Sequence, residues 1–505
     1  MPHDEEATEP GSIWTAEAWG RVARYTQLGA LAAALALGCA SRTVVREPHG
    51  PEWLGEQASF ALDPLVREGA SWGAMVVGPS GDVILDRNSS MLFVPASNLK
   101  LITTACALER LGPDHTFLTL LILDGVVRND TAFGDLVIVG GGDPSFASAE
   151  LGGENPLYAW CDSVSALGIR VITGDVLGCG DLLPAGMPGA GWAWDDLGFG
   201  FAAATSGLCY RDNAADVCLT PTTPGDAVQW VVEPVSAKAD ITCHVATGEA
   251  GELRSLRLLW PPGGGVTISG VVPADERAVK LPVVATDPPR MAAAELLRAL
   301  TARGIPVLGQ AGVGCGLATD GHRVASRVSP GLADLTTVIN HRSKNLWAEQ
   351  LLRIMGRDGA GGDWTPAAGI NAACETLDAL GVSRDELSMV DGSGLSRLNL
   401  SSPAFMVGLL RRALERTWGE SLAASLPLAG RSGNLEERLK GSPAEGRIRA
   451  KTGSMQGIRA LSGYATTLSG DDMVFSVMIN GYSGPGAVMD RALDRFCTLL
   501  VTTNP

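Results

Sequence analysis

The chain has 505 residues, of which 46% are hydrophobic and 19% are charged. This composition is typical of globular proteins, and the length predicts about two to four domains. The formal net charge of −16 argues against a nucleic-acid partner, which would require a basic patch or stripe. The six histidines are scattered singly. No pair of them has the spacing of metal ligands, so a zinc hydrolase is not expected.

The N-terminal segment, residues 1–40, predicts a targeting signal. Two arginines precede an apolar stretch over residues 28–38, which fits an export signal and is too short to span a bilayer. The stretch ends in the sequence Ala-Leu-Gly-Cys39, an imperfect bacterial lipobox because its first position is usually leucine. We expect lipid on Cys39, with simple cleavage after Ala40 as the alternative. The acidic residues near the N-terminus do not suit the basic end of a signal, which leaves open a start further downstream.

The remaining chain predicts strands at both ends and helices between them. Residues 72–79 and 83–86 predict two strands around a turn, and residues 97–112 predict a helix that ends at Gly112-Pro113. Strand-like stretches follow at residues 117–123, 135–139, 171–176 and 228–233. Helices are expected at residues 291–303, 331–339, 346–355, 367–380 and 402–416. Three more strands and a final helix are expected at residues 446–452, 458–467, 473–479 and 486–501.

This order of elements predicts an α/β (α+β) fold. The strand hairpin near the start and the three strands near the end would form one antiparallel sheet, built from both ends of the chain. Residues 116–324 would then be an insertion, in which Gly- and Pro-rich stretches separate the strands.

The ten cysteines leave the disulfide pattern open. If Cys39 carries lipid, nine remain, and this odd number leaves at least one thiol unpaired. In an exported protein, Cys209 with Cys218, or Cys161 with Cys179, could form a disulfide. The spacing does not fix the pairing, and a buried thiol is the ordinary state of the other cysteines.

Ser97 stands three residues before Lys100, where a strand-like stretch gives way to a helix. This spacing places both side chains on one face of the helix, about one turn apart. A serine hydroxyl is a poor nucleophile until a base removes its proton, and a lysine can be that base only if its pKa is lowered. The helix N-terminus would also direct backbone N–H groups toward developing negative charge. The pair is a candidate nucleophile and base, although the same spacing is common on exposed helix turns.

Two Ser-x-Asn sequences follow, Ser343-Lys344-Asn345 and Ser432-Gly433-Asn434. The first lies between two predicted helices, where a loop can present a hydroxyl and an amide over a cleft. Its serine could relay a proton to a leaving group, and its amide could hold a substrate backbone. The second lies in a glycine-containing turn, and we expect it to be only a turn.

The sequence Lys451-Thr452-Gly453-Ser454 ends a β-rich stretch. Glycine at this position would let an extended substrate lie close against the edge of the sheet. The lysine and the hydroxyl groups could hold a terminal carboxylate, with the lysine acting as a point charge. The alternative is an edge-strand lysine that only keeps the strand from pairing with other chains.

Ser-x-x-Lys, Ser-x-Asn and Lys-Thr-Gly occur here in the order found in serine enzymes that react with penicillin. Over about residues 55–500 the chain resembles the class C low-molecular-mass penicillin-binding proteins, D-alanyl-D-alanine carboxypeptidases that also act as endopeptidases. The long separation of Ser97 from Ser343 fits this family, which inserts extra domains between the first two motifs. Further stretches that resemble the family are residues 134–144, 191–198, 345–352, 391–397 and 461–464.

The resemblance implies a penicillin-binding, β-lactamase-like antiparallel sheet flanked by helices, formed by residues 42–115 and 325–505. Residues 116–324 would form a β-rich insertion of one or two domains. Ser97 would attack the carbonyl between two D-alanines, with Lys100 as general base. Backbone N–H groups of Ser97 and Ser454 would form the oxyanion hole.

The other motif residues would position the substrate. By the same resemblance, Ser343 would pass a proton to the departing D-alanine and Asn345 would bind the peptide. Lys451 and Thr452 would hold the substrate carboxylate. Two further residues are expected to contact the peptide stem, with turn capping and an ordinary salt bridge as their respective alternatives: Asp143 and Arg397.

The resemblance also implies partners and a location. Substrates would be peptidoglycan peptides that end in D-Ala-D-Ala, and β-lactams would be covalent inhibitors. Neither a cofactor nor a metal would be needed. The protein would lie in the bacterial cell envelope, in the periplasm or attached to the membrane through the lipid on Cys39.

Two other functions are compatible with parts of this pattern. A β-lactamase or related esterase-type acyl hydrolase shares the three motifs, but it places them much closer together and usually uses an added carboxylate for deacylation. A non-catalytic peptidoglycan-binding lipoprotein would have a broken motif set, whereas all three motifs are intact here.

Overall fold

The computed structural model describes residues 50–66, 69–180, 188–261, 264–316, 321–358 and 364–504. The expected signal over residues 1–40 and the lipidation site Cys39 lie outside the described residues. Within these described ranges, every helix is too short or too polar to cross a membrane.

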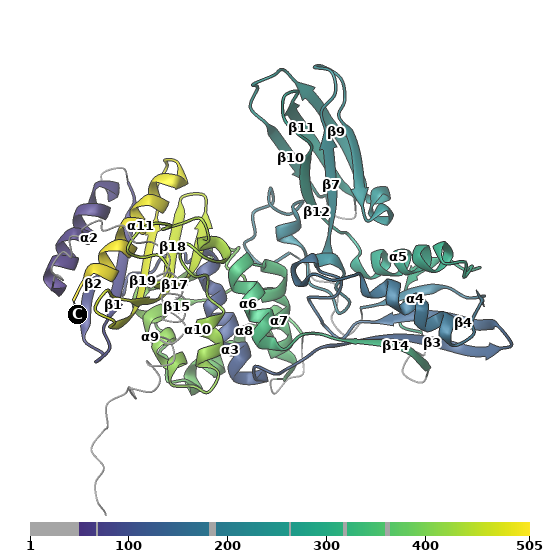
Figure 1. Ribbon diagram of the computed structural model, residues 1–505, viewed down its shortest axis with the longest axis horizontal. Helices are drawn as coiled ribbons and strands as arrows, with labels where there is room; N and C mark the ends of the chain where they lie inside the picture. Colours follow the sequence, from purple (N-terminus) through teal and green to yellow (C-terminus); the bar gives the residue numbers. More distant parts are fainter. Residues whose placement is uncertain are drawn as a thin grey trace, which may run out of the picture.

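A five-stranded antiparallel sheet forms the centre of one half of the molecule (Figure 1). Its order is β17-β18-β19-β1-β2, so strands from the end of the chain pair directly with strands from its start. The prediction of a mixed α/β fold with one antiparallel sheet built from both chain ends is therefore confirmed. The strands are β1 (Ser71–Val77), β2 (Val83–Arg87), β17 (Ile448–Met455), β18 (Ile458–Thr466) and β19 (Asp472–Asn480).

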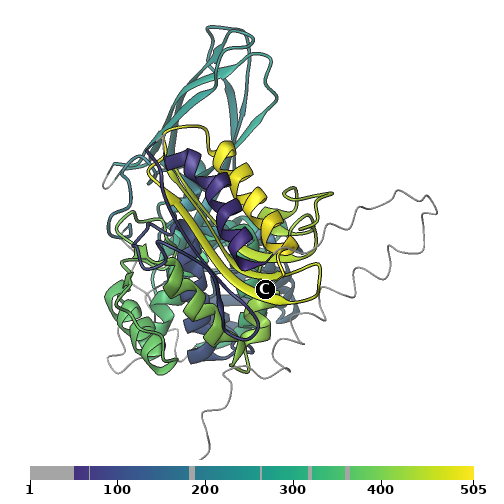
Figure 2. The same ribbon diagram turned by 90° about the vertical axis from the view of Figure 1, so that its left-hand side faces the viewer.

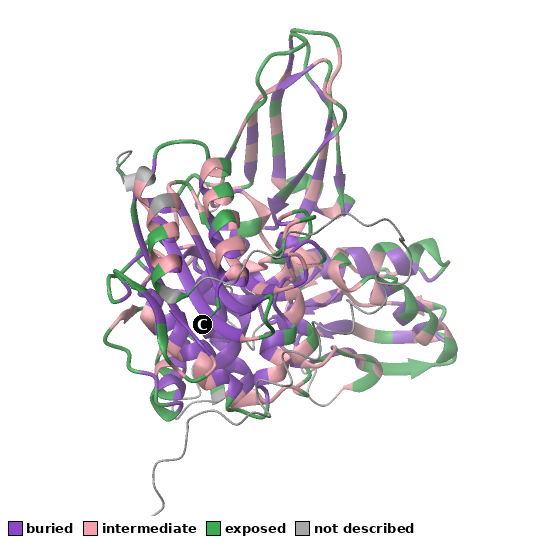
Figure 3. Cartoon of the chain, turned by 60° about the vertical axis from the view of Figure 1, so that its left-hand side comes forward, coloured by how far each residue is buried: buried purple, intermediate pink, exposed green. Residues whose placement is uncertain are grey.

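Helices cover both faces of this sheet. On one face α2 (Pro51–Val66) and α11 (Gly486–Thr502) lie side by side, as Figure 2 shows. On the other face α9 (Pro403–Leu414) packs against β19 and β1. Because side chains alternate between the faces of a strand, β19 sends Phe475 and Val477 toward the first pair of helices and Val474 toward the second group. A sheet buried on both faces has apolar residues at successive positions, and Figure 3 shows this buried layer.

A group of helices extends the second face. The first turn of α3 and the junction of α6 with α7 approach the outer edge of β17. The short 3-10 helix η1 (Ala96–Leu99) also contacts β17. These helices share one hydrophobic core with α9. They are α3 (Lys100–Leu111), α6 (Leu332–Arg342), α7 (Asn345–Asp358), α8 (Pro366–Ala379) and α10 (Gly419–Ala424).

The chain between α3 and α6 is rich in strands (Figure 1). Its largest sheet has the order β13-β6-β4-β3-β14, with β5 beside β4. The last strand, β14, pairs with β3 as far as Val328, so the sheet crosses the boundary expected at residue 324. The strands are β3 (Leu118–Arg128), β4 (Thr131–Val139), β5 (Val171–Ile172), β6 (Val176–Cys179), β13 (Ala311–Val313) and β14 (His322–Val328).

Two three-stranded sheets build an arm that projects from this region (Figure 1). One has the order β12-β7-β8 and the other β10-β11-β9. The α-helices α4 (Pro156–Ala166) and α5 (Pro288–Ala302) of the inserted region share a hydrophobic core with both sheets. The strands of the arm are β7 (Ala214–Thr220), β8 (Gln229–Glu233), β9 (Ile241–Gly248), β10 (Ser255–Leu259), β11 (Val266–Pro273) and β12 (Val279–Val284).

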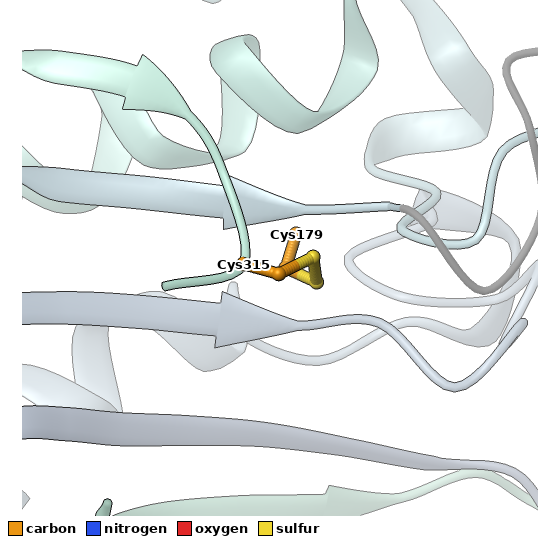
Figure 4. The surroundings of a disulfide bond; sticks show 2 residues. All are labelled: Cys179 and Cys315. Carbon is orange, nitrogen blue, oxygen red and sulfur yellow. A yellow bond between two sulfur atoms is a disulfide. The ribbon is translucent and has the colours of Figure 1, made fainter. Parts of the chain in front are cut away.

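A disulfide joins Cys179, at the end of β6, to Cys315, just after β13 (Figure 4). The two strands are parallel neighbours, so their ends lie at the same edge of the sheet and the two Cα atoms are 4.6 Å apart. The pairings of Cys161 with Cys179 and of Cys209 with Cys218 are wrong. Cys161 is buried within its helix and, like Cys209 and Cys218, remains a thiol.

Candidate active site

The expected nucleophile Ser97 lies in a short 3-10 helix, η1 (Ala96–Leu99), which leads directly into α3. The next residue, Asn98, is buried and donates from Nδ2 to Ser462 Oγ of β18 at 2.7 Å. This hydrogen bond holds η1 against the main sheet. Ser97 itself is half-buried, so its position is constrained while part of its surface stays accessible.

Lys100, the first residue of α3, is fully buried. Its Nζ lies 3.0 Å from Ser97 Oγ. Two further oxygens contact the same nitrogen, Asn345 Oδ1 at 2.6 Å and the Ser393 carbonyl at 2.5 Å. Three segments that are distant in the sequence therefore fix one amine beside the serine hydroxyl.

The surroundings of Lys100 favour its uncharged form. Burial lowers its pKa to about 7 because the ammonium loses its hydration, and the carboxylates of Asp391 and Glu349 oppose this shift. Near neutral pH a substantial fraction of Lys100 is therefore the free amine. Only the free amine can accept a proton from Ser97.

Ser343 and Asn345 flank the junction between α6 and α7. Ser343 adopts a left-handed backbone conformation with φ of 58°, which an L-residue adopts only where the surroundings require it. The resulting sharp turn brings Ser343 Oγ to 3.1 Å from Lys451 Nζ. Asn345 bridges two regions, because Oδ1 contacts Lys100 and Nδ2 donates to the Phe201 carbonyl of the insertion at 2.9 Å.

Lys451 lies on β17, the edge strand of the main sheet, and is fully buried. Its Nζ donates to Ser343 Oγ and, at 2.8 Å, to the Thr452 carbonyl. Burial, and to a smaller extent the nearby Lys100, holds the pKa of Lys451 well below its usual range. Both hydrogen-bond partners are neutral oxygens, so neither of them is a carboxylate that would compete with an incoming anion.

The three residues after Lys451 line the same edge. Position 453 requires a glycine, because a Cβ there would lie 2.4 Å from the Pro95 carbonyl oxygen. The close neighbour is thus another part of the same chain, whereas the sequence analysis expected a substrate there. Thr452 is half-buried and Ser454 is exposed, so both can be reached along the strand.

A buried carboxylate, which the sequence analysis did not single out, holds the backbone segment that contacts Lys100. Glu349 Oε1 accepts hydrogen bonds from the backbone N–H groups of Gly392 (3.0 Å) and Ser393 (2.8 Å). The carbonyl of Ser393 in turn accepts from Lys100. Burial, followed by the charge of Asp391, raises the pKa of Glu349 to about 7. One sequence signal existed, since Glu349 follows Asn345 by four residues and thus lies on the same helix face.

Lys344, the middle residue of the Ser-x-Asn motif, fastens the α6–α7 junction to the insertion. Its Nζ lies 2.8 Å from Glu150 Oε1 and 3.0 Å from Asp212 Oδ2. Trp347 donates from Nε1 to the other oxygen of Asp212 at 2.8 Å. The inserted region therefore helps to hold Ser343 in place.

Asp143 and Arg397 are not among the groups that contact Lys100 or Lys451. Asp143 is buried and accepts hydrogen bonds from Ser145 Oγ (2.6 Å) and Arg327 Nη1 (2.8 Å), so its carboxylate is engaged inside the insertion. Arg397 is exposed and donates from both terminal nitrogens to the Gln456 carbonyl at 3.1 Å, just beyond β17.

The second Ser-x-Asn sequence also approaches this edge. Gly433–Leu435 forms a 3-10 turn, η6, in agreement with the expected turn. Within it, Asn434 Nδ2 lies 3.5 Å from Thr452 Oγ1. The turn therefore borders the site, a position that was not predicted for it.

The assembled groups suit acyl transfer. One hydroxyl has an amine base within hydrogen-bond distance, a second hydroxyl lies beside another buried amine, and that amine can bind an anion.

Comparison with known proteins gives the same result. The chain matches the D-Ala-D-Ala carboxypeptidase 3 (S13) family over residues 57–497. It is 32% identical over 455 residues to a D-alanyl-D-alanine carboxypeptidase of an Actinomadura species, covering 86% of this chain and 83% of the relative. D-alanyl-D-alanine carboxypeptidase DacB of Haemophilus influenzae is 26% identical, covering 79% of this chain and 83% of its own length.

The fold is shared as well. The crystal structure of penicillin-binding protein 4 (dacB) from Haemophilus influenzae matches with a TM-score of 0.76 at 25% identity, covering 87% of this chain and 98% of that one. The resemblance to class C low-molecular-mass penicillin-binding proteins is thereby confirmed. The chain is a serine peptidase that belongs to the D-Ala-D-Ala carboxypeptidase 3 (S13) family.

Proposed function

We propose that the protein is a penicillin-sensitive carboxypeptidase that removes the terminal D-alanine from peptidoglycan stem peptides, with Ser97 as its nucleophile. We also propose that it cleaves D-alanyl cross-links between stems as an endopeptidase. The observation that carries the proposal is the contact of 3.0 Å between Ser97 Oγ and Lys100 Nζ, whose pKa is about 7. A base with this pKa is half in its reactive form near neutral pH.

In the proposed reaction, Ser97 Oγ attacks the carbonyl carbon of the penultimate D-alanine while Lys100 takes the hydroxyl proton. The backbone N–H groups of Ser97 and Ser454 would stabilise the oxyanion of the tetrahedral intermediate. As the C–N bond breaks, the proton that Lys100 took from Ser97 would pass through the Ser343 hydroxyl to the departing amine. Water then hydrolyses the acyl ester on Ser97 and regenerates the free hydroxyl.

Substrate orientation would follow the edge strand β17. Lys451 and Thr452 would bind the terminal carboxylate, and Asn345 would hold the peptide backbone. Arg397, at the other end of the strand beside Gln456, would face the stem that becomes the acyl group. For Asp143 we propose only an indirect role, because its carboxylate is engaged by Ser145 and Arg327.

For the location, we propose the bacterial cell envelope, with lipid on Cys39 as the attachment to the membrane. Both rest on the apolar segment and the lipobox-like sequence near the N-terminus. The disulfide between Cys179 and Cys315 supports export, because such bonds persist in oxidising compartments.

Ser97→Ala should abolish covalent labelling by a fluorescent penicillin and the release of D-alanine from a D-Ala-D-Ala-ended pentapeptide. Lys100→Arg should also be inactive, because a guanidinium does not give up its proton at working pH. The two readouts are gel fluorescence and mass spectrometry of the products. Unfolding curves matching that of the unmutated protein provide the control, and labelling of a folded Ser97→Ala protein would show that another residue is the nucleophile.

Glu349→Gln should shift the acidic limb of the acylation rate to lower pH. Lys100 loses activity as pH falls through its pKa, because the ammonium cannot accept the serine proton. The charged groups around it are the carboxylates of Glu349 and Asp391, which raise its pKa, and the neighbouring Lys451. The pKa of Glu349 is itself about 7, so its charge is present mainly above neutral pH. Removing that charge lowers the pKa of Lys100 further in this range. The measurement is the rate of acylation by a chromogenic β-lactam from about pH 5 to about pH 9.

Glu349→Ala distinguishes the effect of the Glu349 charge from the effect of its hydrogen bonds to the backbone. The glutamine can still accept from the Gly392 and Ser393 N–H groups, whereas alanine leaves both unsatisfied, at a cost of about 1–3 kcal/mol each. Alanine should therefore lower the rate at every pH by about tenfold or more. A Gln variant with an unshifted profile would contradict the electrostatic role of Glu349.

Lys451→Ala should lower kcat/KM on a D-Ala-D-Ala-ended pentapeptide by about 10²-fold or more, which corresponds to about 2.7 kcal/mol. A desolvated ion pair in a cleft is worth several kcal/mol, unlike an exposed pair. The amidated peptide should be a poor substrate already and lose much less. Lys440→Ala, which breaks an exposed pair with Glu437, is the matched control. Equal losses on both peptides would mean that Lys451 does not bind the carboxylate.

Growth with radiolabelled palmitate should label the unmutated protein in a bacterial host that lipidates such proteins, and Cys39→Ser should remove the label. The thiol is the group to which lipid would be attached, and serine cannot replace it in this modification. If neither protein is labelled and the mature N-terminus is Ser41, the protein is a soluble enzyme of the periplasm instead.

A further inference from the structure

A polar pocket of about 560 Å³ lies beside Ser343, between the α6–α7 junction and the inserted region. We refer to it as the leaving-side pocket. Charged and polar side chains line it together with Ser343: Glu150, Arg211, Asp216, Lys280, Arg342 and Asn434. Its walls come from η2 (Ala149–Leu151) and β12 of the insertion and from η6 near β17. None of these residues except Ser343 has a role in the proposed chemistry.

The pocket lies beside the middle of the edge strand β17. Asn434 lines it, and Asn434 Nδ2 is 3.5 Å from Thr452 Oγ1, where the substrate carboxylate is proposed to bind. Arg397 contacts Gln456, just beyond the C-terminal end of the same strand. A substrate that follows β17 with its acyl stem toward Gln456 therefore directs its leaving group toward this pocket. Ser343, which would protonate that leaving group, is part of the pocket wall.

The pocket is too large for the leaving group of a carboxypeptidase. Pockets of roughly 300–1,000 Å³ hold ligands of drug size, whereas a single D-alanine would fill only a small part of this volume. A cross-linked substrate has a much larger leaving group, because its amine belongs to the side chain of a second stem peptide. That stem carries free carboxylates close to the amine.

The charges of the pocket suit such a peptide. Lys280 and Arg342 keep 68% and 59% of their side-chain surface exposed, while their partners Asp216 and Glu150 are each 25% exposed. The two pairs are 3.0 and 3.3 Å apart. Each cation therefore meets its carboxylate on one side and presents most of its donors to the pocket and solvent. Asp216 is also 3.7 Å from Arg211, so Lys280 is not needed to neutralise it.

We propose that the leaving-side pocket binds the second stem peptide of a cross-linked substrate and that Lys280 and Arg342 recognise its carboxylates. This inference rests on the proposed function, since it extends the same acyl transfer on Ser97. The bond broken is the amide between a D-alanine carbonyl and the side-chain amine of the second stem. The acyl group passes to Ser97 Oγ, and the amine leaves with the proton that Ser97 lost, relayed through the Ser343 hydroxyl.

The test compares two substrates with the same acyl stem, a pentapeptide ending in D-Ala-D-Ala and a cross-linked peptide dimer. Lys280→Glu should lower kcat/KM on the dimer by about tenfold or more, mainly through KM, and the loss should shrink at high salt. Hydrolysis of the pentapeptide and acylation by penicillin should stay within about twofold. A dimer with amidated carboxylates on the second stem should lose its sensitivity to the variant.

Arg254→Glu is the matched control. Arg254 is 49% exposed, lies 2.7 Å from Glu276 in the inserted region, and does not line the pocket. This variant should change neither substrate. Equal loss on pentapeptide and dimer, no loss on the dimer, or the same loss on the amidated dimer would each overturn the inference. Failure of the unmutated protein to release D-alanine from the pentapeptide would instead refute the carboxypeptidase function, and penicillin acylation would then report the integrity of the site.

Discussion

Burial of the Lys100 side chain costs free energy, because an ammonium in a protein interior loses most of its hydration. The surrounding structure reduces this cost with three oxygens around Nζ and two carboxylates nearby. The result is an amine with a pKa of about 7, neither as basic as a free lysine nor permanently neutral. The amine and the groups that surround it come from the start of α3, from α7 and from the loop that contains Ser393. The packing of these segments against the main sheet therefore determines the pKa of this amine.

The inserted region also helps to position the site residues. The α6–α7 junction carries Ser343 in a left-handed conformation, which needs support from its surroundings. Lys344 supplies that support by binding Glu150 and Asp212 of the insertion, and Asn345 binds the Phe201 carbonyl. A chain with the three motifs but without the insertion would need another way to hold this junction. The insertion is thus connected to the site by specific bonds as well as by the chain itself.

Local sequence patterns predicted the sheet of the main domain and the three motifs, because strand alternation, helix periodicity and short motifs need only neighbouring residues. They did not separate the short strands of the arm, such as Ser255–Leu259, which Gly- and Pro-rich stretches interrupt. Contacts between distant segments were also missed. Cys179 pairs with Cys315 across 136 residues, and Glu349 accepts a hydrogen bond from the backbone N–H of Ser393. Gly453 illustrates the same limit, since its neighbour Pro95 is far away in the chain.

The two buried lysines are coupled through their like charges. Burial, and then the charge of Lys100, lowers the pKa of Lys451. A substrate carboxylate bound at Lys451 would favour the ammonium there, because a neighbouring anion stabilises the charged form. At Lys100, Glu349 and Asp391 oppose the effect of burial on the pKa. This opposition matters, because an amine with a much lower pKa would be too weak to take the serine proton.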